Sequence, residues 1–177
     1  MDVHIKILSM SPCLHGFGMN DLKQLMAITS KAFWKSGEVI FTQRDPGRDM
    51  FIICSGKVRI WRENGAKGVS LASLSVGESF GEMGLVELGE RSASATAIQD
   101  TLALRICYDQ LFAAPDAASL LYRNIARALA KRLEIANNVI VFQSQTGGQA
   151  PQMETIDGRK GGIKEMVPPK KPATTTR

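Results

Sequence analysis

Histidine and cysteine are scarce in this chain of 177 residues, and their scarcity excludes several kinds of enzyme. The two histidines, His4 and His15, both lie near the N-terminus, so strands of a core can supply neither a set of histidine metal ligands nor a histidine base for a nucleophile. The three cysteines, Cys13, Cys54 and Cys107, are widely spaced and odd in number, which is typical of reduced structural thiols in a cytoplasmic protein. We therefore expect no catalytic residue, no metal site and a cytoplasmic location.

Long apolar runs and a strong charge excess are also missing. The longest apolar runs, such as Met50–Cys54, are far too short to cross a bilayer, and the N-terminus has no apolar core of a secretory signal. Lys and Arg number 22 against 17 Asp and Glu, so the formal charge of +5 suits an anionic ligand without indicating a nucleic-acid binder. We expect a globular protein with no membrane span.

Short apolar segments separated by turn residues fill the stretch from residue 32 to residue 105. Six segments have the composition of strands: Glu38–Phe41, Met50–Ile53, Lys57–Trp61, Val69–Leu71, Ser94–Ala97 and Thr101–Leu104. Asn64-Gly65 is the clearest hairpin signal, because a tight turn needs residues that tolerate positive φ. The pattern predicts a mainly β core, a barrel or sandwich, with helices on either side of it in the sequence.

Helical periodicity occupies the two sides of this β region. Before it, Asn20-Asp21 is placed to cap a helix that continues to Ile28, and after it Tyr108–Phe112 predicts a short helix. Asp116 is placed to cap a long helix that ends near Phe142. Its apolar positions recur every three or four residues: Leu121, Ile125, Leu129, Leu133, Ala136 and Ile140. Because the helix is long and its stripe narrow, we expect part of it to pack against a second copy in a homodimer.

Residues 144–177 have a different composition from the rest of the chain. They are rich in Gly, Pro, Thr, Gln and Lys and contain few large apolar side chains, so they cannot supply a core. We therefore predict one folded domain over residues 1–143 and a disordered basic tail over residues 144–177.

The glycine-rich stretch from Gly77 to Ala93 interrupts the strand pattern and carries the chemistry. Gly81 and Gly84 let the backbone approach a ligand, and a helical turn that starts near Gly81 would point N–H groups at an anion. Arg91 offers a planar fork for two phosphate oxygens. Glu82 would repel a phosphate, so it suits hydroxyl groups on the same ligand. The segment predicts a ligand with one phosphate and one neighbouring hydroxyl.

The run Phe80-Gly81-Glu82-Met83-Gly84-Leu85, followed by Arg91-Ser92-Ala93, resembles the phosphate-binding cassette of the cyclic nucleotide-binding domain family. That family includes bacterial catabolite-activator-like proteins, kinase regulatory subunits and cyclic-nucleotide-gated channels. The resemblance extends to residues 36–40, 43–45 and 51–58 and covers roughly residues 5–143. It implies a β-roll, a double-stranded β-helix similar to a jelly roll, with N-terminal helices and a long C-terminal helix.

The same resemblance implies the roles of single residues. Glu82 would bind the ribose 2′-hydroxyl and Arg91 the cyclic phosphate of cAMP or cGMP, and the C-terminal helix would bring Asn137 to the base. The Ser92 hydroxyl would contact the phosphate or the base. The implied ligand-binding set is Phe80, Gly81, Glu82, Met83, Arg91, Ser92, Ala93 and Asn137. Where catabolite-activator-like proteins tend to have Thr-Ser, this chain has Ala136-Asn137, so the choice between adenine and guanine stays open.

The function that follows is a non-enzymatic cyclic nucleotide sensor, which signals to a protein effector or a second copy by movement of the long helix. Residues 143–177 supply no winged helix after the long helix, so we expect no specific DNA binding. Two alternatives stay open at this point. In a ligand-free scaffold, Glu82 and Arg91 would form an ion pair and the long helix would bind only protein, whereas a β-roll enzyme of the cupin type would need more histidines than the chain has.

Overall fold

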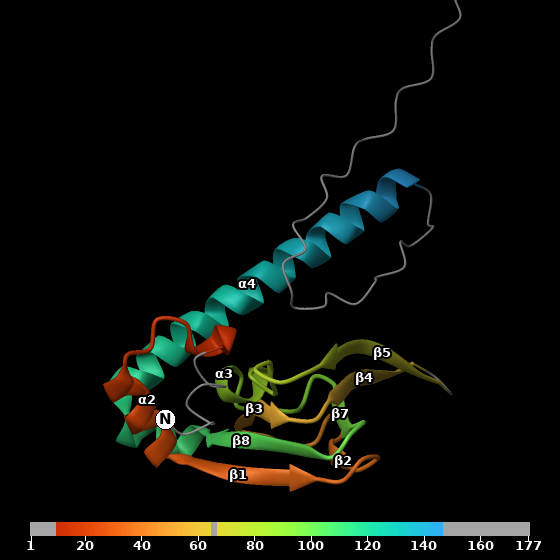
Figure 1. Cartoon of the computed structure of the whole chain (residues 1–177). Coiled ribbons are helices and arrows are strands. Elements are labelled where there is room, and N and C mark those ends of the chain that lie inside the picture. The colour runs from red at the N-terminus through yellow and green to blue at the C-terminus, as the bar shows by residue number, and fades with distance from the viewer. Residues whose placement is uncertain (1–9, 65–66, 147–177) are drawn as a thin grey trace, which may run out of the picture.

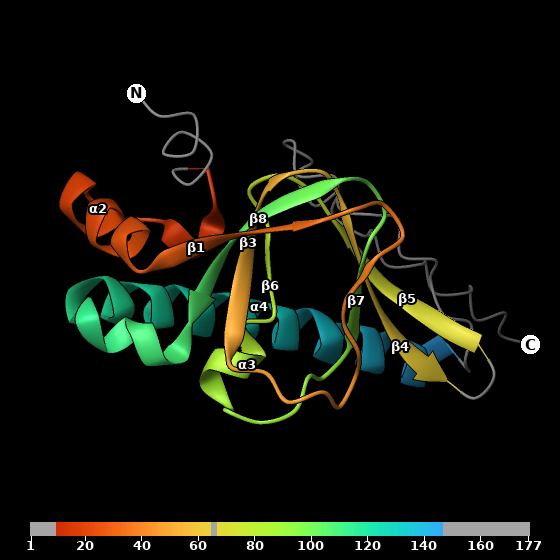
Figure 2. The same cartoon turned by 90° about the horizontal axis from the view of Figure 1, so that it is seen from below.

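Eight strands form two four-stranded antiparallel sheets that face each other, and the helices gather at one end of them (Figures 1 and 2). The computed structural model describes residues 10–64 and 67–146. One sheet has the order β1-β8-β3-β6 and the other the order β2-β7-β4-β5. With the long C-terminal helix, this arrangement is the β-roll that the sequence predicts.

The eight strands include all six predicted segments and two others. The first sheet contains β1 (Thr29–Trp34), β8 (Thr101–Cys107), β3 (Asp49–Ser55) and β6 (Ser79–Phe80). The second contains β2 (Val39–Phe41), β7 (Ser94–Ala97), β4 (Val58–Asn64) and β5 (Lys67–Leu74). The strands that the sequence does not reveal are β1, half of which is polar, and β6, which has two residues. The turn at Gly65 lies outside the described residues, but the strands on either side of it pair antiparallel, as a hairpin requires.

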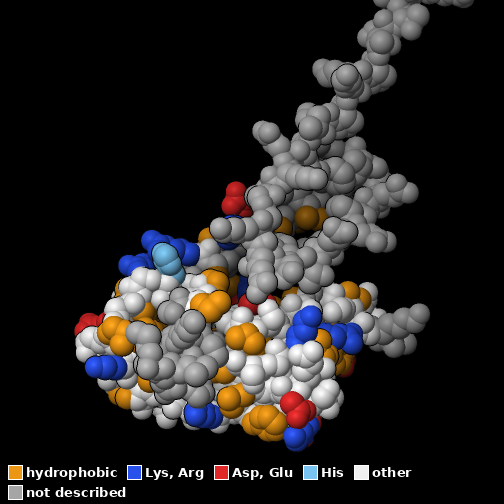
Figure 3. Space-filling view, in the orientation of Figure 1, with side chains coloured by type: hydrophobic (Ala, Val, Ile, Leu, Met, Phe, Trp, Pro, Cys, Tyr) orange, Lys and Arg blue, Asp and Glu red, His pale blue; other side chains and the backbone are white. Residues whose placement is uncertain are grey.

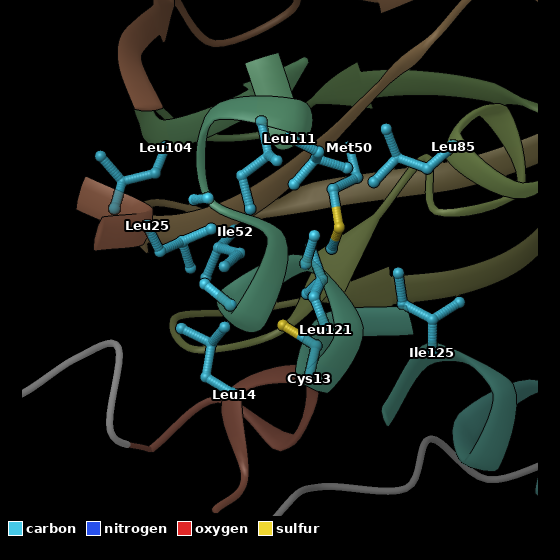
Figure 4. Packing of buried hydrophobic residues seen from close by; sticks show 14 of the residues in the cluster. Cys13, Leu14, Leu25, Met50, Ile52, Leu85, Leu104, Leu111, Leu121 and Ile125 are labelled. Atoms are coloured by element: carbon cyan, nitrogen blue, oxygen red, sulfur yellow. The ribbon is translucent and has the colours of Figure 1, made fainter. Parts of the chain in front are cut away.

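Strand β3 separates two cores. Met50, Ile52 and Cys54 point to the helical layer, where they pack in one cluster with residues of η1, α2 and α4 (Figure 4). Phe51 and Ile53 point the opposite way, into the space between the sheets. Because alternate residues of a strand face opposite sides, a strand that is buried on both sides reads as the uninterrupted apolar run seen in the sequence.

The helices keep the predicted order but differ in their boundaries. They are η1 (Pro12–Leu14), α2 (Met19–Ala27), α3 (Met83–Val86), η2 (Tyr108–Ala113) and α4 (Pro115–Thr146). The expected cap at Asn20-Asp21 is wrong, because α2 begins after Gly18, whose N–H donates to the Asp21 carboxylate at 2.8 Å. Helix α4 begins one residue before Asp116 and ends four residues after the expected end at Phe142. Residues 147–177, most of the predicted tail, lie outside the described residues.

The apolar stripe of α4 divides into a buried part and an exposed part. Leu121 and Ile125 are buried in the core, whereas Leu133 and Ile140 are each 62% exposed. Figure 1 shows the reason, since the first half of α4 packs against the helical end of the roll and the second half extends away from it. No helix in the described part of the chain is long and apolar enough to cross a membrane.

The cysteines have different surroundings. Cys13 and Cys54 are buried in the core, as expected for structural thiols. The apolar, strand-like segment around Cys107 predicts a core residue, and this prediction is wrong, because the side chain is only half-buried and its thiol lies 2.9 Å from Asp49 Oδ1. Within residues 10–64 and 67–146, no three potential ligands among His, Cys, Asp and Glu form a group that could hold a metal ion. On the face drawn in Figure 3, basic and apolar side chains are interspersed.

Candidate functional site

The glycine-rich segment folds as a tight connection between strand and helix. We call residues 80–93 the cassette. It leaves β6 at Phe80, turns at Gly81 with a φ of +79°, and enters the single-turn helix α3 at Met83, close to the predicted start. A Cβ atom at position 81 would lie 3.0 Å from the Asp49 carbonyl oxygen and 2.9 Å from Arg91 Nη1. The turn therefore needs glycine for both its backbone conformation and its space.

Arg91 lies inside the protein at the end of the cassette, only 6% exposed. Its Nη1 donates hydrogen bonds to the Asp49 carbonyl at 2.6 Å and to the Gly81 carbonyl at 3.2 Å, and its guanidinium lies 4.2 Å above the ring of Phe41. Burial lowers the pKa of Arg91 from its ordinary value, and the nearby Asp49 carboxylate opposes that change. An arginine keeps its charge under such a shift, so the site holds a buried cation.

One donor of this cation has no acceptor. Arg91 Nε is buried and makes no hydrogen bond with any described residue. A buried donor without an acceptor costs about 1–3 kcal/mol, so native proteins rarely leave one unsatisfied. An anionic oxygen beside Nε would remove that cost and would neutralise the buried charge.

A glycine in the loop before β3 and a glycine in helix α3 pack closely against this guanidinium. A Cβ atom at Gly47 would lie 2.7 Å from Arg91 Nη2 and closer still to Nε and Cζ. A Cβ atom at Gly84 would lie 2.8 Å from Arg91 Nη1 and 2.6 Å from the Gly47 carbonyl oxygen. Gly47 was not among the predicted site residues, because Asp45-Pro46-Gly47 indicates only a turn until the fold brings it to Arg91.

The loop that carries Gly47 also fixes the backbone of Arg91. The Arg44 N–H donates to the Arg91 carbonyl at 2.9 Å, and the Arg91 N–H donates to the Asp45 carbonyl at 2.8 Å. The Gly47 N–H donates to the Gly89 carbonyl at 3.2 Å. The cassette and the preceding loop therefore hold the arginine as one unit.

Glu82 does not pair with Arg91, the partner that the ligand-free scaffold would require. Its side chain is buried and forms an ion pair with Arg132 of α4, fifty residues later in the chain. Arg132 itself is 58% exposed in its side chain. Glu82 and Arg91 do not form the mutual pair, since Arg91 Nη1 is bonded to carbonyl oxygens instead.

A small cavity of about 100 Å³ lies beside Glu82, between η1, β6 and α4. Its lining residues are Pro12, Cys13, Glu78, Ser79, Glu82, Ile125, Ala128 and Arg132. Burial raises the pKa of the Cys13 thiol, which lies 3.1 Å from the Ser11 hydroxyl. Ligand pockets are typically about 300–1,000 Å³, so this cavity is too small to hold a nucleotide.

The other predicted residues occupy different environments. Phe80 is 2% exposed, and its ring stacks on Phe51 at 5.1 Å, so it supports the roll from inside. Met83 is half-buried, Ser92 exposed and Ala93 buried, all within the cassette. Asn137 is exposed on α4, more than one helical turn beyond the residue that contacts Glu82, and its role stays a prediction.

Arg132 is the residue of the site that sequence reasoning missed. It lies seven positions after Ile125 and therefore on the same side of α4, and its side chain reaches Glu82 although 58% of that side chain is exposed. That periodicity is the signal that could have linked it to Glu82.

Known proteins share this segment. Residues 31–115 match the family model described as "Cyclic nucleotide-binding domain". These residues form a cyclic nucleotide-binding domain. The structure is similar to the crystal structure of the Thermus thermophilus catabolite activator protein, with a TM-score of 0.71 and 36% identity, over 76% of this chain and 63% of that one.

Curated relatives carry the domain in different contexts. The chain is 37% identical over 128 residues to the cyclic AMP receptor protein of Thermus thermophilus, a match that covers 72% of this chain and 59% of the relative. It is 35% identical over 145 residues to glutaminase 1 of Bradyrhizobium diazoefficiens, which covers 78% of this chain and 23% of that enzyme. The chain therefore spans well under two thirds of the length of these relatives, and one of them is an enzyme.

Proposed function

We propose that this chain is a non-enzymatic sensor that binds a cyclic nucleotide, cAMP or cGMP, in the cassette. The observation that carries the proposal is the buried Arg91 cation, with an unpaired Nε donor and three glycines around it. This arrangement leaves a donor and a charge for one anionic group. The family of residues 31–115 and the name of the Thermus relative support a cyclic phosphodiester as that group.

Glu82 and Arg91 bind different parts of the ligand. Arg91 Nε faces the phosphate, and the free backbone N–H groups near Ser92 and Ala93 complete its surroundings. Glu82 accepts a hydrogen bond from the ribose 2′-hydroxyl, a role that suits a carboxylate because it has only acceptors. A ring-opened nucleotide has a second phosphate charge and a free 3′-hydroxyl, so it fits one arginine and one carboxylate less well.

Helix α4 is the proposed output element. Its Arg132 is bonded to the carboxylate that would receive the ribose, and its Tyr122 hydroxyl lies 3.4 Å from the Leu85 carbonyl of α3. A ligand hydroxyl at Glu82 changes the interaction that holds α4 to the cassette. Binding thereby shifts the population of α4 positions, in proportion to the difference in ligand affinity between them.

The exposed part of α4 supports a homodimer as the unit that α4 regulates. Leu133, Ala136 and Ile140 are exposed and recur at spacings of three and four, and they continue a spacing that Leu129 begins where α4 still packs against the core. We call these three exposed residues the α4 seam. This spacing is the heptad pattern of a two-stranded coiled coil. We propose that α4 pairs with α4 of a second copy, and that a protein effector reads the geometry of the pair.

Calorimetric titration with cAMP and cGMP tests the binding proposal. We expect one site per chain, and a loss of at least about a hundredfold in affinity for Arg91→Ala, because a buried bond to a charged group contributes about 1.5–3 kcal/mol and Arg91 offers more than one. Arg91→Lys should also bind weakly, since an ammonium cannot reproduce the fork. Arg48→Lys is the control, because Arg48 is exposed and pairs with Asp109.

A protein-interaction module without a ligand is the second candidate, and the exposed α4 seam favours it. The same titration separates the two functions. A chain that dimerises and shows no heat with either nucleotide at 1 mM would leave only the interaction module. Equal binding with Ala or Lys at position 91 would instead overturn the role of Arg91 as the phosphate ligand.

A further inference from the structure

Strand β4 presents one row of residues to the interior of the roll. Val58 is fully buried, and Ile60 packs against the same cluster between the sheets. Arg62 lies two residues after Ile60 on the same strand, so it is on the same inner face. Arg59 and Trp61 belong to the outer face, where the Trp61 indole donates to the Thr96 hydroxyl at 3.0 Å.

The register places Arg62 beside the end of the cassette. Strands β4 and β7 pair antiparallel from Val58↔Ala97 to Trp61↔Ser94, and one further step puts Arg62 opposite Ala93. Ala93, like Ala95 and Ala97, is buried, so the inner face continues through it towards Arg91. Ser92 and Ala93 form a bend that connects this position to Arg91, two residues earlier in the chain.

The inner face around Arg62 is apolar and uncovered. Its partner on β5 is Val69, 45% exposed, and Leu71 in the neighbouring bulge is 50% exposed. The Arg62 guanidinium is exposed and forms no hydrogen bond or ion pair with any residue that the structure describes. An exposed apolar surface with one unpaired planar donor at its edge is suited to an aromatic ring that carries acceptors.

We propose that Arg62 reads the base of the cyclic nucleotide and selects guanine over adenine. The inference rests on the proposed binding function. A phosphate at Arg91 puts the ribose and then the base along the inner face towards Val69 and Leu71. A guanidinium has donors only, and guanine presents two adjacent acceptors, O6 and N7, whereas adenine has an amino donor in place of O6. The paired hydrogen bonds therefore form with guanine and not with adenine.

Titration of three nucleotides tests the assignment. We expect cGMP to bind the wild-type chain at least about tenfold more tightly than cAMP, which is the lower part of the range for one bidentate arginine contact. Cyclic IMP keeps O6 and N7 but lacks the 2-amino group, so its affinity should stay close to that of cGMP. Arg62→Ala should weaken cGMP and cyclic IMP about tenfold and change cAMP less than about twofold.

Arg59→Ala is the matched control, because it removes the same charge from the same strand on the outer face, and it should leave the order of the three nucleotides unchanged. Thermal unfolding of each variant verifies that it is folded. A wild-type preference for cAMP, or an equal loss for all three nucleotides in Arg62→Ala, would overturn the role of Arg62 while the sensor function stands. Absence of binding of every nucleotide to the wild-type chain would overturn the sensor function itself.

Discussion

Substitution of Gly47 by alanine should disable the site without any change in its charged residues. The added Cβ atom would lie 2.7 Å from Arg91 Nη2, whereas ordinary van der Waals contact begins at 3.4 Å. The guanidinium would have to move by at least 0.7 Å, the difference between these two distances, and further at Nε. The ring of Phe41 lies 4.2 Å from the guanidinium and restricts its movement away from position 47, so the Arg91 side chain has to change its conformation.

The size of the effect follows from the bonds that this movement breaks. A displacement of that extent disrupts the 2.6 Å hydrogen bond from Nη1 to the Asp49 carbonyl and misplaces the Nε donor. Hydrogen bonds to a charged group contribute about 1.5–3 kcal/mol each. Nε is the donor assigned to the phosphate, so its misplacement should cost about 1.5–3 kcal/mol, which is roughly ten- to a hundredfold in Kd.

Calorimetric titration with cGMP and cAMP measures this loss, and Gly89→Ala provides the control. Gly89 lies in the facing loop and accepts the hydrogen bond from the Gly47 N–H, but a Cβ atom there would find its nearest neighbour, the Glu87 carbonyl oxygen, at 3.8 Å. Gly89→Ala should therefore bind like the wild-type chain. If folded Gly47→Ala binds either nucleotide within threefold of the wild type, Arg91 is not the phosphate ligand in the position described.

Three further predictions concern the charged and apolar residues around the site. Arg132→Ala should lower the free energy of unfolding by about 2 kcal/mol in urea titration, because it leaves the buried Glu82 carboxylate without its ion-pair partner. The value is moderate because Arg132 itself is more than half exposed, and an unchanged midpoint would contradict the ion pair. Leu133→Glu should shift sedimentation of the chain from dimer to monomer, because it puts charges in the proposed α4 seam; a dimer that persists would refute that seam. Hydrogen bonds from the Lys35 ammonium and the Ser36 amide hold the pKa of Asp100 below its ordinary value of 3.8. Its stabilising contribution is therefore present above that pH and lost as the pH falls through the lowered pKa, so Asp100→Asn should reduce the acid dependence of unfolding there, and identical acid curves would refute the assignment.

Local signals in the strands are sufficient to predict the mainly β core, and the family resemblance adds the β-roll. The buried strand around Phe51 is an uninterrupted apolar run, and the half-buried strands are short apolar segments bounded by turn residues. β1 escapes notice because Thr29, Ser30 and Lys31 are polar: the strand lies at the sheet edge, where solvent covers one side. Its pairing with β8 is a long-range contact that no local pattern contains.

The site is predictable only where its residues are adjacent in sequence. Gly81, Glu82 and Arg91 lie within one short segment, and their chemistry alone indicates a phosphate beside a hydroxyl. Gly47 and Arg132 come from a distant loop and a distant helix, and their roles exist only after folding. Helical spacing puts Arg132 on the same side of α4 as Ile125, but only the fold shows that Glu82 lies within its reach.

The Nε–H group of Arg91 is the most direct reporter of the central claim, because it is buried and without an acceptor in the described structure. Its resonance can be followed by nitrogen-15 NMR and assigned with Arg91→Lys. The account predicts a downfield shift and slower hydrogen exchange when cGMP or cAMP saturates the chain, and no change with guanosine or adenosine, which lack the phosphate. An Arg91 resonance that stays in place at saturating cyclic nucleotide would contradict the account.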